Sequence, residues 1–190
     1  MIEIRQNGGV CVGKCILIKP DISFESDIQA FRNEMLEANS SIAGAGPLYR
    51  MEKIKEWLEF NKNCEREETV PENWVICEQF IYVRELDNKV VGMIQFRHNF
   101  NEFLEKYGGH IGYSIRPDER RKGYAKSMLA DCLNICKLQG LKDVLITCIQ
   151  ENEGSKHTIL ANGGVYESTV YYETDNVYLE RYWIHFVEDI

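Results

Sequence analysis

Residues 110–126 of the chain read HIGYSIRPDERRKGYAK. The first six residues are largely apolar and β-prone, which predicts a strand, and Pro117 ends that strand. A basic loop that contains Gly123 follows. Apolar residues then recur at the spacing of a helix from about Gly123 to Leu138. We therefore expect a strand, a basic loop and a helix in direct succession.

The loop that enters this helix has the properties of an anion-binding site. The first backbone N–H groups of a helix have no partner within it and lie at the positive end of its macrodipole. Gly123 and the small Ala125 leave room for a phosphate to approach the backbone. Residues 116–126 carry 5 basic and 2 acidic side chains, although the net charge of the chain is -8. On composition alone, a solvated basic turn explains the segment equally well.

The same loop carries a family motif. Its six residues from Arg120 to Ala125, RRKGYA, match the pattern Q/R-x-x-G-x-G/A by which the GNAT N-acetyltransferases bind acyl-CoA. The strand before the loop, the helix behind it, a strand over 144–149 and a helix start at Asn152-x-x-Ser155 also stand at the family's spacing. The sequence therefore resembles the GNAT superfamily, most clearly over 90–172.

The resemblance implies a fold, a co-substrate and a reaction. The fold is of the α/β (α+β) class, with a mixed, largely antiparallel sheet that is splayed at the CoA site and has helices on both faces. The co-substrate is acetyl-CoA, and the acetyl group passes directly to a primary amine. The pyrophosphate would be held by the loop that begins at Arg120, through backbone groups of Arg121, Lys122, Gly123, Tyr124, Ala125 and Lys126. The pantetheine would lie on Ile115 and Arg116, and its far end would meet Asn152 and Ser155.

One position departs from the family pattern. Many members have a Tyr seven residues after that Asn, where it protonates the departing thiolate, and this chain has Ile159. A thiol with a pKa near 8.5 can leave as a thiolate and take its proton from water. Tyr166, Tyr171 or Tyr172 could substitute, but nothing in the sequence selects one of them.

The acceptor also needs to lose a proton, because an alkyl ammonium has a pKa near 10.4. His110 stands where many family members have a Glu suited to this task, and the ordinary pKa of histidine near 6.5 fits work at neutral pH. The alternative is a histidine that is hydrogen-bonded at the strand edge after Gly108 and Gly109. Glu78, in the preceding hairpin, is a weaker candidate base, and its alternative is a solvated strand residue.

The rest of the chain predicts one domain over 1–190, since no repeat or linker divides it. The loop 40–47 between the first two helices is either a candidate lid or a plain connector. The other expected elements are a strand at 16–18, helices from an N-cap at Ser23 to Met35 and from Leu48 to Leu58, a hairpin of 74–84 and 90–97, helices at 101–107 and 152–161, and a hairpin of 165–172 and 177–186.

Composition excludes several classes of function. The 7 cysteines contain no C-x-x-C pair and the 4 histidines have no ligand spacing, so we expect no metal and interpret the cysteines as buried structural thiols. The chain has no signal peptide or membrane-spanning run, which favours the cytoplasm. A pI near 5.1 disfavours nucleic acids and membrane surfaces and suits cationic amines. The main rival to an enzyme is a non-catalytic acyl-CoA-binding or regulatory domain of the same fold.

Overall fold

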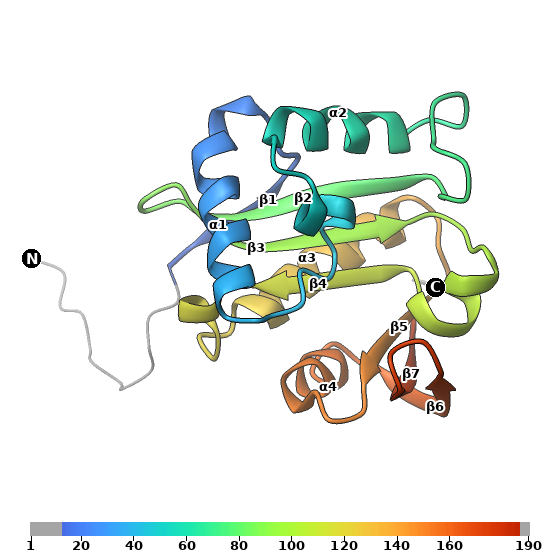
Figure 1. Ribbon diagram of the computed structural model, residues 1–190. Coiled ribbons are helices and arrows are strands. Elements are labelled where there is room, and N and C mark those ends of the chain that lie inside the picture. Colours follow the sequence, from blue (N-terminus) through green and yellow to red (C-terminus); the bar gives the residue numbers. More distant parts are fainter. Residues whose placement is uncertain (1–12, 187–190) are drawn as a thin grey trace, which may run out of the picture.

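The computed structural model describes residues 13–186, and its strands form two antiparallel sheets (Figure 1). The first sheet has the order β1-β2-β3-β4, with β1 at Cys15–Ile18, β2 at Cys77–Arg84, β3 at Lys89–Arg97 and β4 at Ile111–Ile115. The second has the order β5-β7-β6, with β5 at Asp143–Ile149, β6 at Val165–Tyr172 and β7 at Val177–His185.

The helices cover both faces of the first sheet, as Figure 1 shows. The helices α1 and α2 lie on one face and α3 on the other, with α4 beside β5. Their bounds are Glu25–Glu37 for α1, Ile54–Cys64 for α2, Tyr124–Leu138 for α3 and Glu153–Leu160 for α4. The expected fold class is confirmed.

Alternation along β2 and β3 divides the core into two layers. Ile81 and Met93 face the layer of α1 and α2, where Trp57 is fully buried. Phe80 and Ile94 face the opposite layer, which α3 completes. The face of the sheet on which a strand residue lies therefore determines which helical layer it packs against.

The two sheets meet at His110 and Leu145 and separate beyond this point. The backbone N–H of His110 donates to the Leu145 carbonyl oxygen at 2.8 Å. Gly109 has φ +65°, and a Cβ on it would lie 2.6 Å from the same oxygen, so only glycine fits there. No strand ladder joins β4 to β5 within residues 13–186. This is the expected splay.

The first half of the chain differs from expectation at two helix starts. The cap of the first helical turn is Asp21, whose carboxylate accepts a hydrogen bond from the backbone N–H of Ser23 at 2.7 Å. The expected helix from Leu48 is instead a short 3₁₀ turn, because Met51 and Lys53 have extended backbone and α2 begins only at Ile54. Apolar spacing continued across this break because both segments bury residues in one layer.

The loop 40–47 packs directly on β4. Gly44 has φ +75°, and a Cβ on it would lie 2.0 Å from the carbonyl oxygen of Gly112. The side-chain amide of Gln79 donates to the Gly44 carbonyl at 2.8 Å, and the indole of Trp57 donates to Ala45 at the same distance. These contacts favour the connector over the lid.

The cysteines of the described chain are free thiols, and most are buried. Cys132 and Cys136 are fully buried in the α3 layer and Cys148 is buried on β5, which confirms the structural interpretation for these three. In the part of the chain that the structure describes, no three His, Cys, Asp or Glu residues group as metal ligands. No helix between residues 13 and 186 is long and apolar enough to cross a membrane.

Candidate functional site

The N-terminus of α3 is open to an anion. Gly123 occupies the N-cap position in the left-handed conformation, with φ +88°, and no side chain of the described residues caps the helix. Arg121 also has a positive φ of 60°. The loop therefore turns sharply into the helix and leaves its first N–H groups without a side-chain partner.

The basic side chains of this segment divide into two groups. Arg116 is only 2% exposed, and its guanidinium donates to the Asp27 carboxylate on α1 at 2.9 Å. Arg120 donates to the Ile115 carbonyl at 3.1 Å. These arginines fasten the end of β4, and the backbone N–H and carbonyl of Arg116 are bonded to Val91 and Glu119 as well.

Arg121 and Lys126 form the second group. Both side chains are exposed, and neither makes a hydrogen bond or ion pair with any described residue. They flank Gly123 in sequence and can extend toward a phosphate bound at the helix start. The structure thus distinguishes the basic side chains that are bound within the protein from those that are free, which the sequence could not do.

A buried carboxylate beneath the loop fixes its shape. Glu119 is 3% exposed and accepts hydrogen bonds from Arg84 and Lys89 at 2.9 Å and from Lys122 at 2.8 Å. Burial would raise the pKa of Glu119, but these three donors outweigh it and lower the pKa to about 2. Tyr124 is buried and accepts from Arg84 at 3.2 Å, so Lys122 and Tyr124 shape the loop from below.

The α4 end of the site is joined to β4 by a tyrosine. The Asn152 side chain caps α4 by accepting from the backbone N–H of Ser155 at 3.1 Å. The hydroxyls of Tyr113 and Ser155 lie 2.8 Å apart, so Tyr113 spans from β4 to the first turn of α4. Burial raises the pKa of Tyr113 to about 12, which keeps its hydroxyl protonated at neutral pH. Strand alternation was the only sequence signal for this residue.

The position of the usual family tyrosine is part of the core. Ile159 is fully buried, and a Cβ on Gly164 would lie 2.4 Å from its Cγ2. Tyr166 and Tyr171 lie on β6 and are 51% and 43% exposed. Tyr172, on the same strand, packs against the rings of Phe103 and Tyr107. Among the described residues, none of these three hydroxyls makes a hydrogen bond to α4, as the hydroxyl of Tyr113 does.

His110 connects the two sheets. Its Nδ1 accepts a hydrogen bond from the backbone N–H of Leu145 at 2.9 Å, in addition to the backbone bond between the same residues. A neutral histidine that accepts at Nδ1 carries its proton on Nε2, so neither nitrogen has a free lone pair. Burial and then the charge of Arg97 lower the pKa of His110 to about 4. This geometry favours the alternative of a hydrogen-bonded strand-edge histidine over a general base.

Glu78 lies far from the loop. Its carboxylate accepts hydrogen bonds from His98 at 3.0 Å and from Gln139 at 2.6 Å, and Lys19 pairs with it at 2.6 Å. The bond from His98, with smaller help from the other donors, outweighs burial and lowers the pKa of Glu78 to about 2. Gln139 follows the last residue of α3, and a 15-residue helix is about 22 Å long. The structure therefore does not bring Glu78 to the loop that precedes Tyr124.

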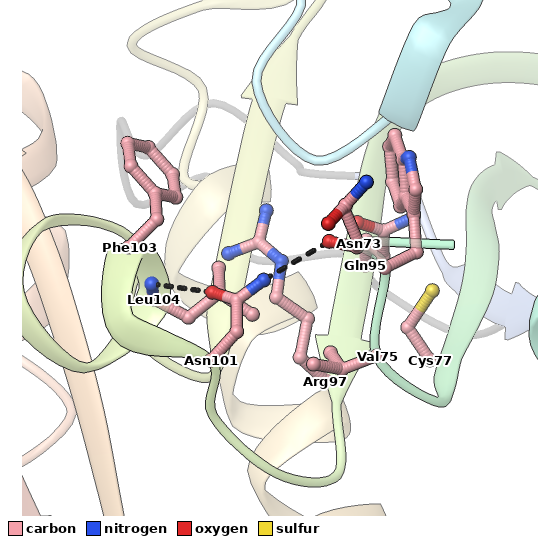
Figure 2. A pocket seen from close by; sticks show the side chains of 9 residues that line it. Asn73, Val75, Cys77, Gln95, Arg97, Asn101, Phe103 and Leu104 are labelled. Atoms are coloured by element: carbon pink, nitrogen blue, oxygen red, sulfur yellow. Dashed lines mark hydrogen bonds between the residues drawn. The ribbon is translucent and has the colours of Figure 1, made fainter. Parts of the chain in front are cut away.

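Figure 2 shows a cavity of about 290 Å³, lined by Gln95 and Arg97 of β3. These residues alternate with the same face as Met93, so the cavity lies on the α1 and α2 side of the first sheet. Arg97 lines it and donates from Nη1 to the carbonyl oxygens of Gly108 and Gly109, at 3.1 and 3.2 Å. These carbonyls directly precede His110, so the cavity adjoins the junction of the two sheets. Sequence reasoning missed it, because its walls come from three separate segments, 73–77, 95–97 and 101–104.

Comparisons with known proteins agree on one family. The family profile described as "Acetyltransferase (GNAT) domain" matches residues 22–165. No curated protein sequence matches the chain. The fold is similar to that of the microcin C7 self-immunity acetyltransferase MccE, solved with acetyl-CoA and AMP, at a TM-score of 0.67 and 17% identity over 95% of this chain and 98% of that one.

Two further solved structures have the same fold. RimL, a ribosomal L7/L12 α-N-protein acetyltransferase solved with coenzyme A, has a TM-score of 0.67 and 14% identity over 93% of this chain and 96% of its own. RimJ from Mycobacterium smegmatis, solved in complex with CoA-disulfide, has a TM-score of 0.67 and 18% identity over 91% and 82% of the two chains.

Proposed function

The chain belongs to the GNAT acetyltransferases, and from this we propose that it transfers the acetyl group of acetyl-CoA directly to the nitrogen of a primary amine. In this reaction a C–N bond forms, the thioester C–S bond breaks, the acceptor nitrogen loses a proton and the CoA thiolate gains one. The observation that carries the proposal is the uncapped, glycine-led start of α3 with two free basic side chains beside it. Solved relatives of this fold that hold acetyl-CoA or coenzyme A support it.

Acetyl-CoA would bind from this loop along the splay. Backbone N–H groups of Gly123 to Lys126 would hold the pyrophosphate, and Arg121 and Lys126 would add charge. The pantetheine would lie along the end of β4 at Ile115 and Arg116, with its far end at Asn152 and Ser155. The cofactor would supply the activated acetyl group. Six free thiols in the described chain suit the reducing cytoplasm that we propose as its compartment.

The reaction as a whole is tested by measuring CoA thiol release from acetyl-CoA with and without a panel of primary amines. We expect release that depends on both the amine and the enzyme. Binding of acetyl-CoA without amine-dependent release would support the rival, a non-catalytic acyl-CoA-binding domain of this fold. No binding and no release would contradict the proposal altogether.

Tyr113 is the residue that we propose to protonate the departing thiolate. Its hydroxyl is held at α4, and its raised pKa keeps it protonated at neutral pH. Tyr113→Phe should lower kcat about 10²- to 10⁴-fold, because a positioned acid contributes on this scale, while the affinity for acetyl-CoA stays nearly unchanged.

The control for Tyr113→Phe is Tyr166→Phe, which removes an exposed hydroxyl from β6 and should leave kcat unchanged. The Tyr113 hydroxyl also bonds Ser155, so its loss can lower stability as well as kcat. The melting temperatures of both variants should therefore be measured. A Tyr113→Phe enzyme with wild-type kcat would remove this tyrosine from the mechanism and leave protonation to water.

A further inference from the structure

Arg97 is a cation whose binding edge has no partner in the described chain. A guanidinium has five N–H donors, and Arg97 uses its Nη1 for the carbonyls of Gly108 and Gly109. No residue in 13–186 accepts from its Nε or Nη2, and no carboxylate there pairs with it. Nε and Nη2 form the edge that binds a carboxylate through two parallel hydrogen bonds. Arg97, which lines the cavity, therefore has an unused carboxylate-binding edge.

Gln95 adds a second unsatisfied donor to the same cavity. Its side chain is 1% exposed, and no residue between 13 and 186 accepts a hydrogen bond from its Nε2. Buried amide donors are almost always paired, so this nitrogen is available to an acceptor, either a ligand or the equally unpaired Oε1 of Gln79, its register partner on β2. Figure 2 shows the guanidinium of Arg97 in the middle of the lining, with Phe103 on one side and Gln95 on the other. Both polar groups offer donors to one ligand.

The side chain of Asn101, another polar group of the lining, is already occupied. The amide of Asn101 donates to the Asn73 carbonyl at 3.1 Å and accepts from the backbone N–H of Leu104 at 2.9 Å, as the dashed lines in Figure 2 mark. The lining contains no Asp or Glu. An anion in this cavity therefore meets the cation of Arg97 and the amide of Gln95, and no carboxylate among the described lining residues repels it.

The remaining wall is apolar. Trp74, Val75, Phe103 and Leu104 line it. At about 290 Å³ the cavity is near the lower end of the size range of small-molecule pockets. These dimensions and this wall suit one small molecule with an apolar or aromatic body rather than a folded protein surface.

We propose that this cavity binds the carboxylate of the acceptor, and that the acceptor is a small amino acid-like amine with an apolar side chain. That the ligand is an acceptor rests on the proposed function, whereas the binding of its carboxylate does not. A carboxylate on Arg97 lies beside the junction at Gly109, from which the splay opens. The guanidinium charge also favours the neutral form of a nearby amine, which is the form that attacks the thioester.

Calorimetry with two probes tests the carboxylate pocket without any turnover. N-acetyl-L-phenylalanine should bind the full-length protein about 10- to 100-fold more tightly than N-acetyl-L-phenylalaninamide, because the acid makes charge-assisted hydrogen bonds to Arg97. Gln95→Glu should abolish this preference, because the new carboxylate pairs with the Arg97 guanidinium and repels the carboxylate of the probe. Arg97 keeps its hydrogen bonds to the Gly108 and Gly109 carbonyls in this variant. Gln29→Glu is the control: it makes the same charge change on α1, outside the cavity lining, and should keep the preference.

Equal affinities for acid and amide, or no binding of either at millimolar concentration, would overturn the pocket. Acetyl transfer to L-phenylalanine and to phenethylamine separates this outcome from failure of the proposed function. Acid-selective binding without CoA release from either amine leaves the pocket standing and contradicts the transferase. Turnover of both amines at equal kcat/KM, unchanged in Gln95→Glu, supports the transferase and overturns the pocket.

Discussion

Gly123→Glu should abolish most of the stabilisation that acetyl-CoA gives to the protein. The variant places a carboxylate at an anion site and a side chain where φ is +88°. A ligand at 100 times its Kd stabilises the folded state by about 2.7 kcal/mol, and a 100-fold weaker Kd reduces this to about 0.4 kcal/mol. For a domain of this size the melting shift should fall from about 5–10 °C to about 1 °C.

Gly140→Glu is a matched control at the other end of the same helix. Gly140 has φ +86°, and a Cβ on it would meet nothing within 4 Å, so the backbone strain and the charge change are the same while the anion site is untouched. Differential scanning fluorimetry with and without acetyl-CoA measures both variants. Gly123→Glu with a wild-type shift, or Gly140→Glu with an equally reduced one, would contradict the binding of acetyl-CoA at this loop.

The elements around this loop could be predicted from sequence because their signals are local. The helical spacing of apolar residues from Ala125 and the turn residues between the strands are patterns of residues close together in the chain. Both patterns predicted the bounds of these elements within one or two residues. The first helical cap was misplaced by two residues because both Asp21 and Ser23 favour N-caps, and only the folded backbone distinguishes them.

The roles of charged residues could not be predicted because their partners are remote. Arg116 is bound by Asp27, 89 residues earlier, and Glu119 meets Arg84, 35 residues earlier. A basic cluster in sequence therefore did not reveal which cations are free for a phosphate. Arg97 was missed for the same reason, since its surroundings are assembled from segments on both sides of β3.

His110→Ala should destabilise the protein strongly, and His110→Asn should recover much of the loss. Removing the ring leaves the backbone N–H of Leu145 without its acceptor and opens space beside Phe100, whose ring centroid lies 4.1 Å away. An unpaired buried donor costs about 1–3 kcal/mol, and the cavity adds to this, so we expect a total of about 2–4 kcal/mol. The melting temperature should fall by about 5–15 °C.

His110→Asn separates a positioning role from proton abstraction. The Oδ1 of asparagine can take the place of Nδ1 as the acceptor for Leu145, but the amide cannot accept a proton at neutral pH. If His110 only holds the sheets together, the Asn variant should keep most of its kcat and lack the stability defect of Ala. An Asn variant as stable as the wild type yet as inactive as the Ala variant would instead restore His110 as the general base.

The pH dependence of stability gives an independent measurement of the same residue. The pKa of His110 is lowered to about 4 in the folded state, below its ordinary value of 6.5, so the unfolded chain binds the proton more readily. The contribution of His110 to stability is therefore complete above about pH 6.5 and is lost as the pH falls toward 4. Urea unfolding of wild type and His110→Asn at several pH values should show the wild-type advantage shrinking over this interval. An advantage that stays constant from pH 7 to pH 4 would mean that the imidazole does not titrate in this way, and that its bond to Leu145 is not what joins the sheets.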